Sequence, residues 1–98
     1  MRTLTILIAL AAGALGQPAP DSASNIASAI RARQYEQALK LARSALEAAP
    51  NDIRILTMEA IALSGLGNDR EALAAYYRAL GLAPDSLAAL EGAGRVWE

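Results

Sequence analysis

The sequence predicts an all-α fold in which antiparallel helix hairpins stack into an array of about two and a half repeats. The first observation is that residues 38–50 return thirty-four positions later as residues 72–84. The second is that apolar residues recur inside both copies at the helical step of three to four. A fixed self-similarity of this length is typical of stacked repeats. Six pairs of residues match between the copies: Ala38 with Ala72, Leu39 with Leu73, Ala45 with Ala79, Leu46 with Leu80, Ala49 with Ala83, and Pro50 with Pro84.

The composition limits both the core and the partners. The chain has 98 residues, enough for one small domain, and 54% of them are hydrophobic while only 4% are aromatic. Because there is no Phe, the core must come from Ala, Leu and Ile, and small side chains bury little area each. We therefore expect modest stability. The net charge of −1 provides no basic field, which argues against a nucleic-acid partner.

Residues 1–16 have the layout of a secretory signal peptide. Arg2 gives a short positive start, Leu4 to Ala12 form an apolar run, and Ala14-Leu15-Gly16 supply small residues before a cut at Gln17. The apolar run is too short to cross a bilayer, which needs ~20 residues. The alternatives are an uncleaved anchor and a buried N-terminal helix. A cleaved signal implies that the protein contacts the membrane only transiently.

The predicted location is outside the cytoplasm of a bacterium, in the periplasm or the extracellular space. The chain contains no Cys, so it has no disulfides and no cysteine that could carry a lipid after signal cleavage. The frequent use of Ala, and of Arg over Lys, is consistent with a GC-rich bacterial genome.

The predicted helices follow in order after a Pro-rich leader at residues 17–21, where proline disfavours helix. Asp21 or Ser22 can cap the first helix, whose apolar stripe consists of Ala23, Ile26, Ala27 and Ile30. A turn is expected at Arg33-Gln34. Tyr35 begins the second helix, which Pro50 ends, and its buried face is expected to hold Ala38, Leu39, Ala42, Ala45, Leu46 and Ala49.

Asn51-Asp52 signal the start of a third helix, with Leu56, Ala60 and Leu63 on one face. Residues 65–69 break that helix, because a glycine can adopt a left-handed C-cap and Asn68 or Asp69 can cap the next helix. The fourth helix runs to about Ala83. Pro84-Asp85-Ser86 repeat the stop and cap before a fifth helix that carries Leu87, Leu90, Gly94 and Trp97.

Two helices per thirty-four residues with this pattern resemble the tetratricopeptide repeat. The resemblance covers residues 22–98, divided into a first repeat (22–50), a second repeat (51–84) and the first helix of a third repeat or a cap (85–98). It implies a right-handed superhelical α-solenoid with a concave inner surface. The residues that carry it are Tyr35, Ala38, Ala45, Pro50, Leu56, Ala60, Leu63, Gly67, Ala72, Tyr76, Ala79, Pro84, Leu90, Gly94 and Trp97.

The resemblance also implies a function, because such arrays bind a protein or peptide along the first helix of each hairpin. Tyr77 is a further contact, since it stands beside Tyr76 on one helix and one of the two rings is expected to face outward. The predicted partner-binding residues are Ile30, Arg31, Arg54, Thr57, Ile61, Ser64, Tyr77, Glu91 and Arg95.

We expect no enzymatic activity, metal or cofactor. The absence of His and Cys excludes zinc sites of the usual kind, Ser–His–Asp triads and thiol nucleophiles. Gly65-Leu66-Gly67 lacks the third glycine and the preceding strand of a dinucleotide-binding motif, so it is interpreted as a turn.

The C-terminal end leaves two other functions open. About two and a half repeats is fewer than the ~3 that stable arrays usually need, and no further helix covers Trp97. This edge could make the protein a self-assembling structural module. Alternatively, the chain is the N-terminal helper segment of a longer envelope protein with a separate functional domain.

Overall fold

The computed structural model describes residues 21–97 and contains only helices in that range, which confirms the all-α prediction. The predicted signal peptide and all but the last residue of the Pro-rich leader lie outside the described residues. Within residues 21–97, no helix is both long and apolar enough to cross a membrane. The helices are α2 (Asp21–Arg31), α3 (Tyr35–Ala48), α4 (Ile53–Gly65), α5 (Asp69–Leu82) and α6 (Leu87–Trp97).

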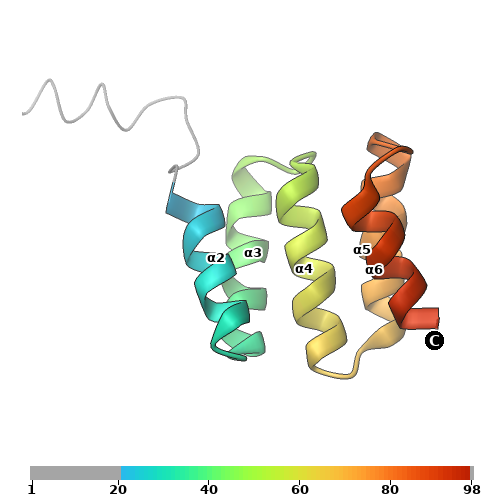
Figure 1. The fold of residues 1–98 in the computed structure, drawn as a ribbon. Coiled ribbons are helices and arrows are strands. Elements are labelled where there is room, and N and C mark those ends of the chain that lie inside the picture. The colour runs from blue at the N-terminus through green and yellow to red at the C-terminus, as the bar shows by residue number, and fades with distance from the viewer. Residues whose placement is uncertain (1–20, 98) are drawn as a thin grey trace, which may run out of the picture.

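The helices pack in two layers, with α2, α4 and α6 in one and α3 and α5 in the other (Figure 1). Each helix packs against the next one along the chain, and α4 also packs against α2 and α6. In the described part of the chain, the backbones of α3 and α5 do not approach each other, although the side chains of Arg43 and Glu71 meet between them. Consequently α4 is the central helix, in contact with all four others.

Polar caps begin two of the helices. The Oδ1 atom of Asp52 accepts hydrogen bonds from the backbone N–H groups of Arg54 at 3.0 Å and Ile55 at 3.4 Å. The hydroxyl of Ser86 likewise accepts from the N–H of Ala89 at 3.4 Å. These bonds satisfy backbone donors that have no partner inside the helix. Asn68, in contrast, precedes α5 without a side-chain capping bond, so that part of the prediction was wrong.

Two helices end in the same left-handed turn, thirty-four residues apart. After α4, Gly67 has a φ of 83°, and the N–H groups of Gly67 and Asn68 donate to Ser64 at 3.0 Å and Leu63 at 2.9 Å. After α2, Arg33 has a φ of 59° and takes the place of Gly67. The two hydrogen bonds after α4 form a Schellman motif, a helix-ending turn that favours glycine at the left-handed position. The corresponding bonds after α2 are Arg33 N–H to Ile30 C=O at 2.9 Å and Gln34 N–H to Ala29 C=O at 2.8 Å.

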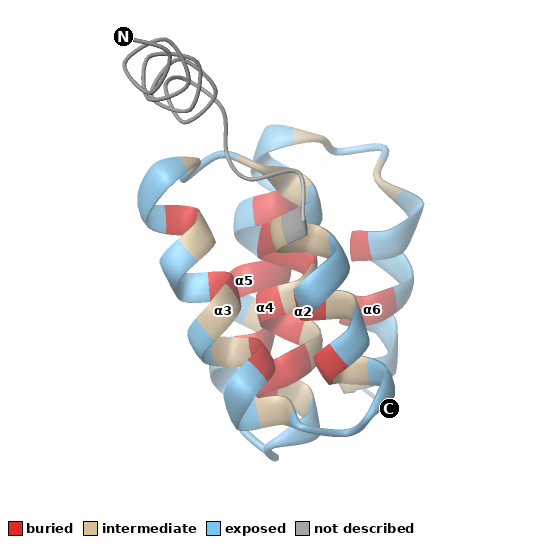
Figure 2. Cartoon of the chain, turned by 90° about the vertical axis from the view of Figure 1, so that its left-hand side faces the viewer, coloured by how far each residue is buried: buried red, intermediate tan, exposed pale blue. Residues whose placement is uncertain are grey.

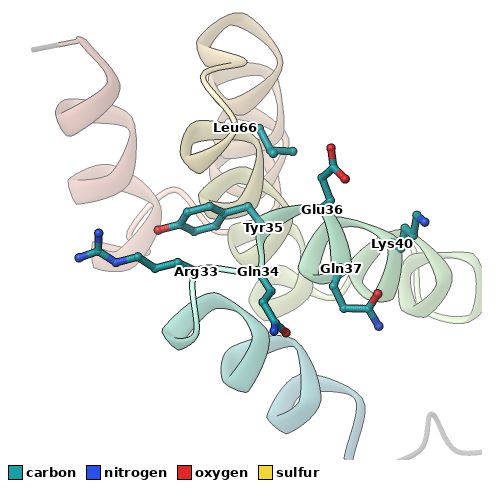
Figure 3. A pocket seen from close by; sticks show the side chains of 7 residues that line it. All are labelled: Arg33, Gln34, Tyr35, Glu36, Gln37, Lys40 and Leu66. Carbon is teal, nitrogen blue, oxygen red and sulfur yellow. The ribbon is translucent and has the colours of Figure 1, made fainter.

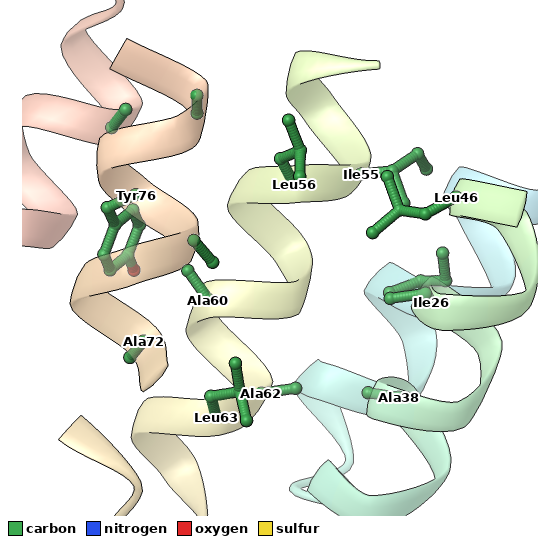
Figure 4. Packing of buried hydrophobic residues seen from close by; sticks show 14 of the residues in the cluster. Ile26, Ala38, Leu46, Ile55, Leu56, Ala60, Ala62, Leu63, Ala72 and Tyr76 are labelled. Carbon is green, nitrogen blue, oxygen red and sulfur yellow. The ribbon is translucent and has the colours of Figure 1, made fainter. Parts of the chain in front are cut away.

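The core lies between the two layers and along α4, as the buried residues in Figure 2 show. Most of it is alanine, together with a few larger residues that include Ile26, Leu56 and Tyr76 (Figure 4). This confirms the expected Ala, Leu and Ile core. Small residues allow helix axes to approach closely, so packing depends on tight contact more than on the area that each side chain buries.

On α6 the residues that pack inward are Ala89, Gly92, Ala93 and Val96, rather than the larger apolar residues that marked this helix in the sequence. Leu87, Leu90 and Trp97 are instead exposed. The aromatic ring of Tyr76 on α5 lies so close to Gly92 that an added Cβ would overlap it, so this inward position requires glycine. Leu87, Leu90 and Trp97 lie on another face, which no helix covers within residues 21–97.

The turn after α2 predicts that Arg33→Gly increases the free energy of unfolding by about 0.5–1 kcal/mol, because a non-glycine residue is strained at positive φ. Urea unfolding followed by circular dichroism would measure the change. Gly67→Ala, which places a Cβ at the equivalent position, should lower stability. Equal or lower stability of Arg33→Gly would contradict the assignment of strain to this residue.

Two glycines of α6 should respond in opposite directions to alanine. Gly92→Ala should lower the free energy of unfolding by about 1–3 kcal/mol, since the new methyl group must displace the Tyr76 ring. Gly94→Ala should raise the free energy of unfolding by about 0.5–1 kcal/mol in dilute solution. Nothing lies within 4 Å of its Cβ position, and alanine favours helix more than glycine does. Thermal unfolding of both variants at the same low concentration tests the pair. Similar effects at both glycines would refute the proposed role of the Tyr76 contact.

Candidate functional site

Eight of the nine predicted partner-binding residues lie on α2, α4 and α6, which form one layer. Since α4 packs against both α2 and α6, these three helices form a continuous layer that carries the eight residues. Tyr77 is the exception, since it lies on α5 in the other layer. The eight are Ile30 and Arg31 on α2, Arg54, Thr57, Ile61 and Ser64 on α4, and Glu91 and Arg95 on α6.

The charged members are exposed and make short-range contacts. Arg54 Nη2 lies 3.4 Å from Asp52 Oδ2, and Arg95 Nη2 lies 3.5 Å from Glu91 Oε2. Arg31 Nη2 donates to the Ser28 hydroxyl at 3.2 Å. Exposed pairs of this kind contribute roughly 0–1 kcal/mol, so a partner could replace them at little cost.

The apolar and hydroxyl members differ in how accessible they are. Ile30 and Ile61 are half-buried and pack against the core, and Ser64 is also half-buried. Thr57 is only 8% exposed, and its Oγ1 donates to the Ile53 carbonyl at 2.8 Å. Thr57 is therefore a buried helix residue with a satisfied hydroxyl and is not part of the exposed surface, so its prediction as a partner-binding residue was wrong.

Arg95 also influences the core. Burial raises the pKa of the Tyr76 phenol above its ordinary value, and the positive charge of Arg95 opposes that rise. Arg95 on α6 therefore lies near the Tyr76 side chain of α5.

Tyr77 lies at the edge formed by α5 and α6. Its side chain is half exposed, as the sequence predicted for one of the two adjacent tyrosines, and Tyr76 is buried. Its hydroxyl accepts a hydrogen bond from Trp97 Nε1 at 2.8 Å. Tyr77 and Trp97 therefore form an aromatic pair that is separate from the exposed residues of α2 and α4.

Sequence reasoning missed a buried carboxylate, Glu59 on α4, which is 8% exposed. Its Oε2 lies 3.5 Å from Arg43 Nε on α3, and its Oε1 lies 4.0 Å from Arg78 Nη1 on α5. Arg43 also reaches Glu71 Oε2 at 3.4 Å. The charges join three helices, and the pairing accounts for an acid among the buried residues of α4. Its position in the sequence could have indicated burial, because Glu59 stands directly before Ala60 and three residues after Leu56, two residues expected on one face of this helix.

A depression of about 640 Å³ lies at the α2–α3 turn. Figure 3 shows that its side chains point in different directions and do not converge on one point. Ligand sites instead present a few convergent polar groups within an apolar cavity. The lining residues are Arg33, Gln34, Tyr35, Glu36, Gln37, Lys40 and Leu66.

Within residues 21–97, no three acidic residues stand close enough together to hold a metal ion. Glu59, the one buried carboxylate in that range, is paired with arginines on two sides. A general base needs a carboxylate that can reach the proton of a substrate. Glu59 is therefore held in ion pairs between helices rather than presented to a substrate.

Comparison of the chain with protein-family models, with curated proteins and with solved structures found no match. The resemblance to the tetratricopeptide repeat consequently rests on residue spacing within this chain. Function has to be inferred from the geometry of the helices and from the residues that they expose.

Proposed function

We propose that this chain is an exported bacterial repeat protein of the tetratricopeptide kind that binds a partner polypeptide and catalyses no reaction. Three features support a repeat array. Six residue pairs recur at a spacing of thirty-four, two equivalent turns at Arg33 and Gly67 share one conformation, and alternate helices belong to alternate layers. Arrays of this kind present an extended surface built from equivalent helices.

The observation that carries the proposal is the packing of α4 against both α2 and α6. It makes one side of the molecule continuous across three helices, which is the length that an extended peptide needs. We call this side the inner surface, defined by Ile30, Arg31, Arg54, Ile61, Ser64, Glu91 and Arg95.

The chemistry of the inner surface suggests the kind of partner. It carries three arginines and one glutamate, so its charge is positive although the whole chain has a net charge of −1. Half-buried Ile30 and Ile61 add apolar area beside the charges. A segment with acidic and apolar side chains would match this pattern, and electrostatic attraction would increase its association rate.

Charge reversal at the inner surface tests the proposal. Arg31→Glu with Arg54→Glu should weaken binding of a partner from a bacterial envelope extract by roughly tenfold, since both changes oppose an acidic segment. Binding should also weaken as salt rises. The affinity of the purified partner, once it is identified by mass spectrometry, would be measured by isothermal titration calorimetry.

The matched control is Lys40→Glu with Arg70→Glu, an equal change of charge on exposed residues of α3 and α5. The control pair should retain the affinity, and circular dichroism should show that both double variants remain folded. An equal loss of affinity in the two double variants would contradict the inner surface as the binding site. Unchanged affinity of the Arg31→Glu, Arg54→Glu variant would do the same.

A further inference from the structure

Four residues on one side of α6 form an exposed stripe: Leu87, Leu90, Gly94 and Trp97. Leu87 is 72% exposed, Leu90 47% and Trp97 70%. Their spacing of three or four residues places them on a single helix face, opposite the face that packs on α4 and α5. Large apolar groups gathered on one exposed face are typical of interaction surfaces.

The same face is buried on α4. Thirty-four residues before Leu90, Gly94 and Trp97 stand Leu56, Ala60 and Leu63. These three residues are buried, and Figure 4 shows Ala60 beside Tyr76 and Ala72 of α5. The stripe on α6 therefore has the residues of a covered helix face, although no helix covers it within residues 21–97.

Tyr77 extends the stripe onto α5. The hydrogen bond from Trp97 Nε1 to its hydroxyl, 2.8 Å long, holds the indole at the surface in one orientation. Aromatic residues that are held in place before binding lose little conformational entropy and are common as interface anchors. The stripe with Tyr77 is the edge surface of the molecule.

The other surfaces of the chain do not complement this edge surface. The exposed residues of α2 and α3 are mostly polar or charged. Of the large hydrophobic residues exposed within residues 21–97, only Leu66 and Leu82 lie outside the edge surface. In the described part of the chain, the one apolar surface of similar extent is thus the edge surface of a second copy. Contact between identical surfaces produces a two-fold symmetric dimer.

We propose that two copies of this chain associate through their edge surfaces, with the α6 helices antiparallel and crossing near Gly94. Nothing lies within 4 Å of the Gly94 Cβ position, so the two backbones can approach closely there. Antiparallel pairing about this residue brings Leu90 toward Trp97 of the second copy. It also brings Glu91 toward Arg95 of the second copy, which makes the charges complementary.

The size of the contact sets its strength. The exposed parts of the four large side chains amount to on the order of 500 Å² per copy. A contact of about 1,000 Å² in total is at the lower limit of specific interfaces. The dimer should therefore be weak, with a dissociation constant in the micromolar range. The contact shares Glu91 and Arg95 with the inner surface, whereas Arg31 and Arg54 take no part in it.

Sedimentation equilibrium of the 98-residue chain tests the proposal across ~1–300 μM, a range that spans a weak dimer. We expect a reversible monomer–dimer equilibrium. Gly94→Glu should raise its dissociation constant at least tenfold, because a side chain at the crossing keeps the helices apart. The monomer has space for this side chain, and circular dichroism would verify that the variant is folded. Trp97→Ala should weaken the dimer similarly.

Ser44→Glu is the matched control, because it adds the same charge to an exposed position on α3 and should leave the dissociation constant unchanged. Trp97 is the single tryptophan of the chain, so its fluorescence reports on the edge surface directly. Its emission should shift to shorter wavelength as the dimer forms. A monomer throughout the concentration range would overturn the proposal, as would association that Gly94→Glu leaves unchanged, including any driven by the apolar run at residues 4–12.

Discussion

The close approach of helices at small residues is the constraint on which the structure depends. Alanines make up most of the buried hydrophobic residues, and each removes little area from water. The core therefore gains stability from many short van der Waals contacts, which weaken steeply when helices move apart. Tyr76 is the large exception, and its ring fits because Gly92 has no side chain. This contact sets how α6 rotates on the rest of the molecule.

The rotation of α6 determines which surfaces the protein can use. With Gly92 against Tyr76, Glu91 and Arg95 join the exposed side that α2 and α4 share, and Leu90 and Trp97 point away from the core. The proposed peptide surface and the proposed dimer surface thus both depend on how α6 packs against α4 and α5. They lie on neighbouring sides of α6 and share Glu91 and Arg95, but the peptide surface is mainly charged and the dimer surface mainly apolar.

Ion pairs also help to fix the orientation of α4. Glu59 lies between Arg43 of α3 and Arg78 of α5, and Arg43 also pairs with Glu71 of α5. A buried pair of this kind often contributes little net stability, because desolvation offsets the attraction. Its effect is on specificity, since burial of this carboxylate is tolerated only where the arginines of α3 and α5 can reach it. The exposed arginines of the inner surface lack this constraint and can exchange partners.

The sequence alone determined the helices and most of their limits. Proline and the capping residues Asp52 and Ser86 act within one turn of chain, so the start of α4 and the stop after α5 followed from local rules. The alanine and leucine composition of the core followed from periodicity in the same way. Of the candidate site, the exposure of Arg31, Arg54, Glu91 and Arg95 could be anticipated, because charged side chains stay in water.

Only the tertiary structure decided which faces of the helices are buried and which are exposed. On α6 the small residues Ala89, Gly92 and Ala93 pack inward, with Gly92 against the Tyr76 ring, and Leu90 and Trp97 lie on a face that no helix covers within residues 21–97. The burial of Thr57 and the pairing of Glu59 depend on neighbouring helices that are distant in sequence. Periodicity identifies an apolar face, and it contains no information about which neighbour covers that face. That choice depends on the shapes of side chains that meet only in the folded chain.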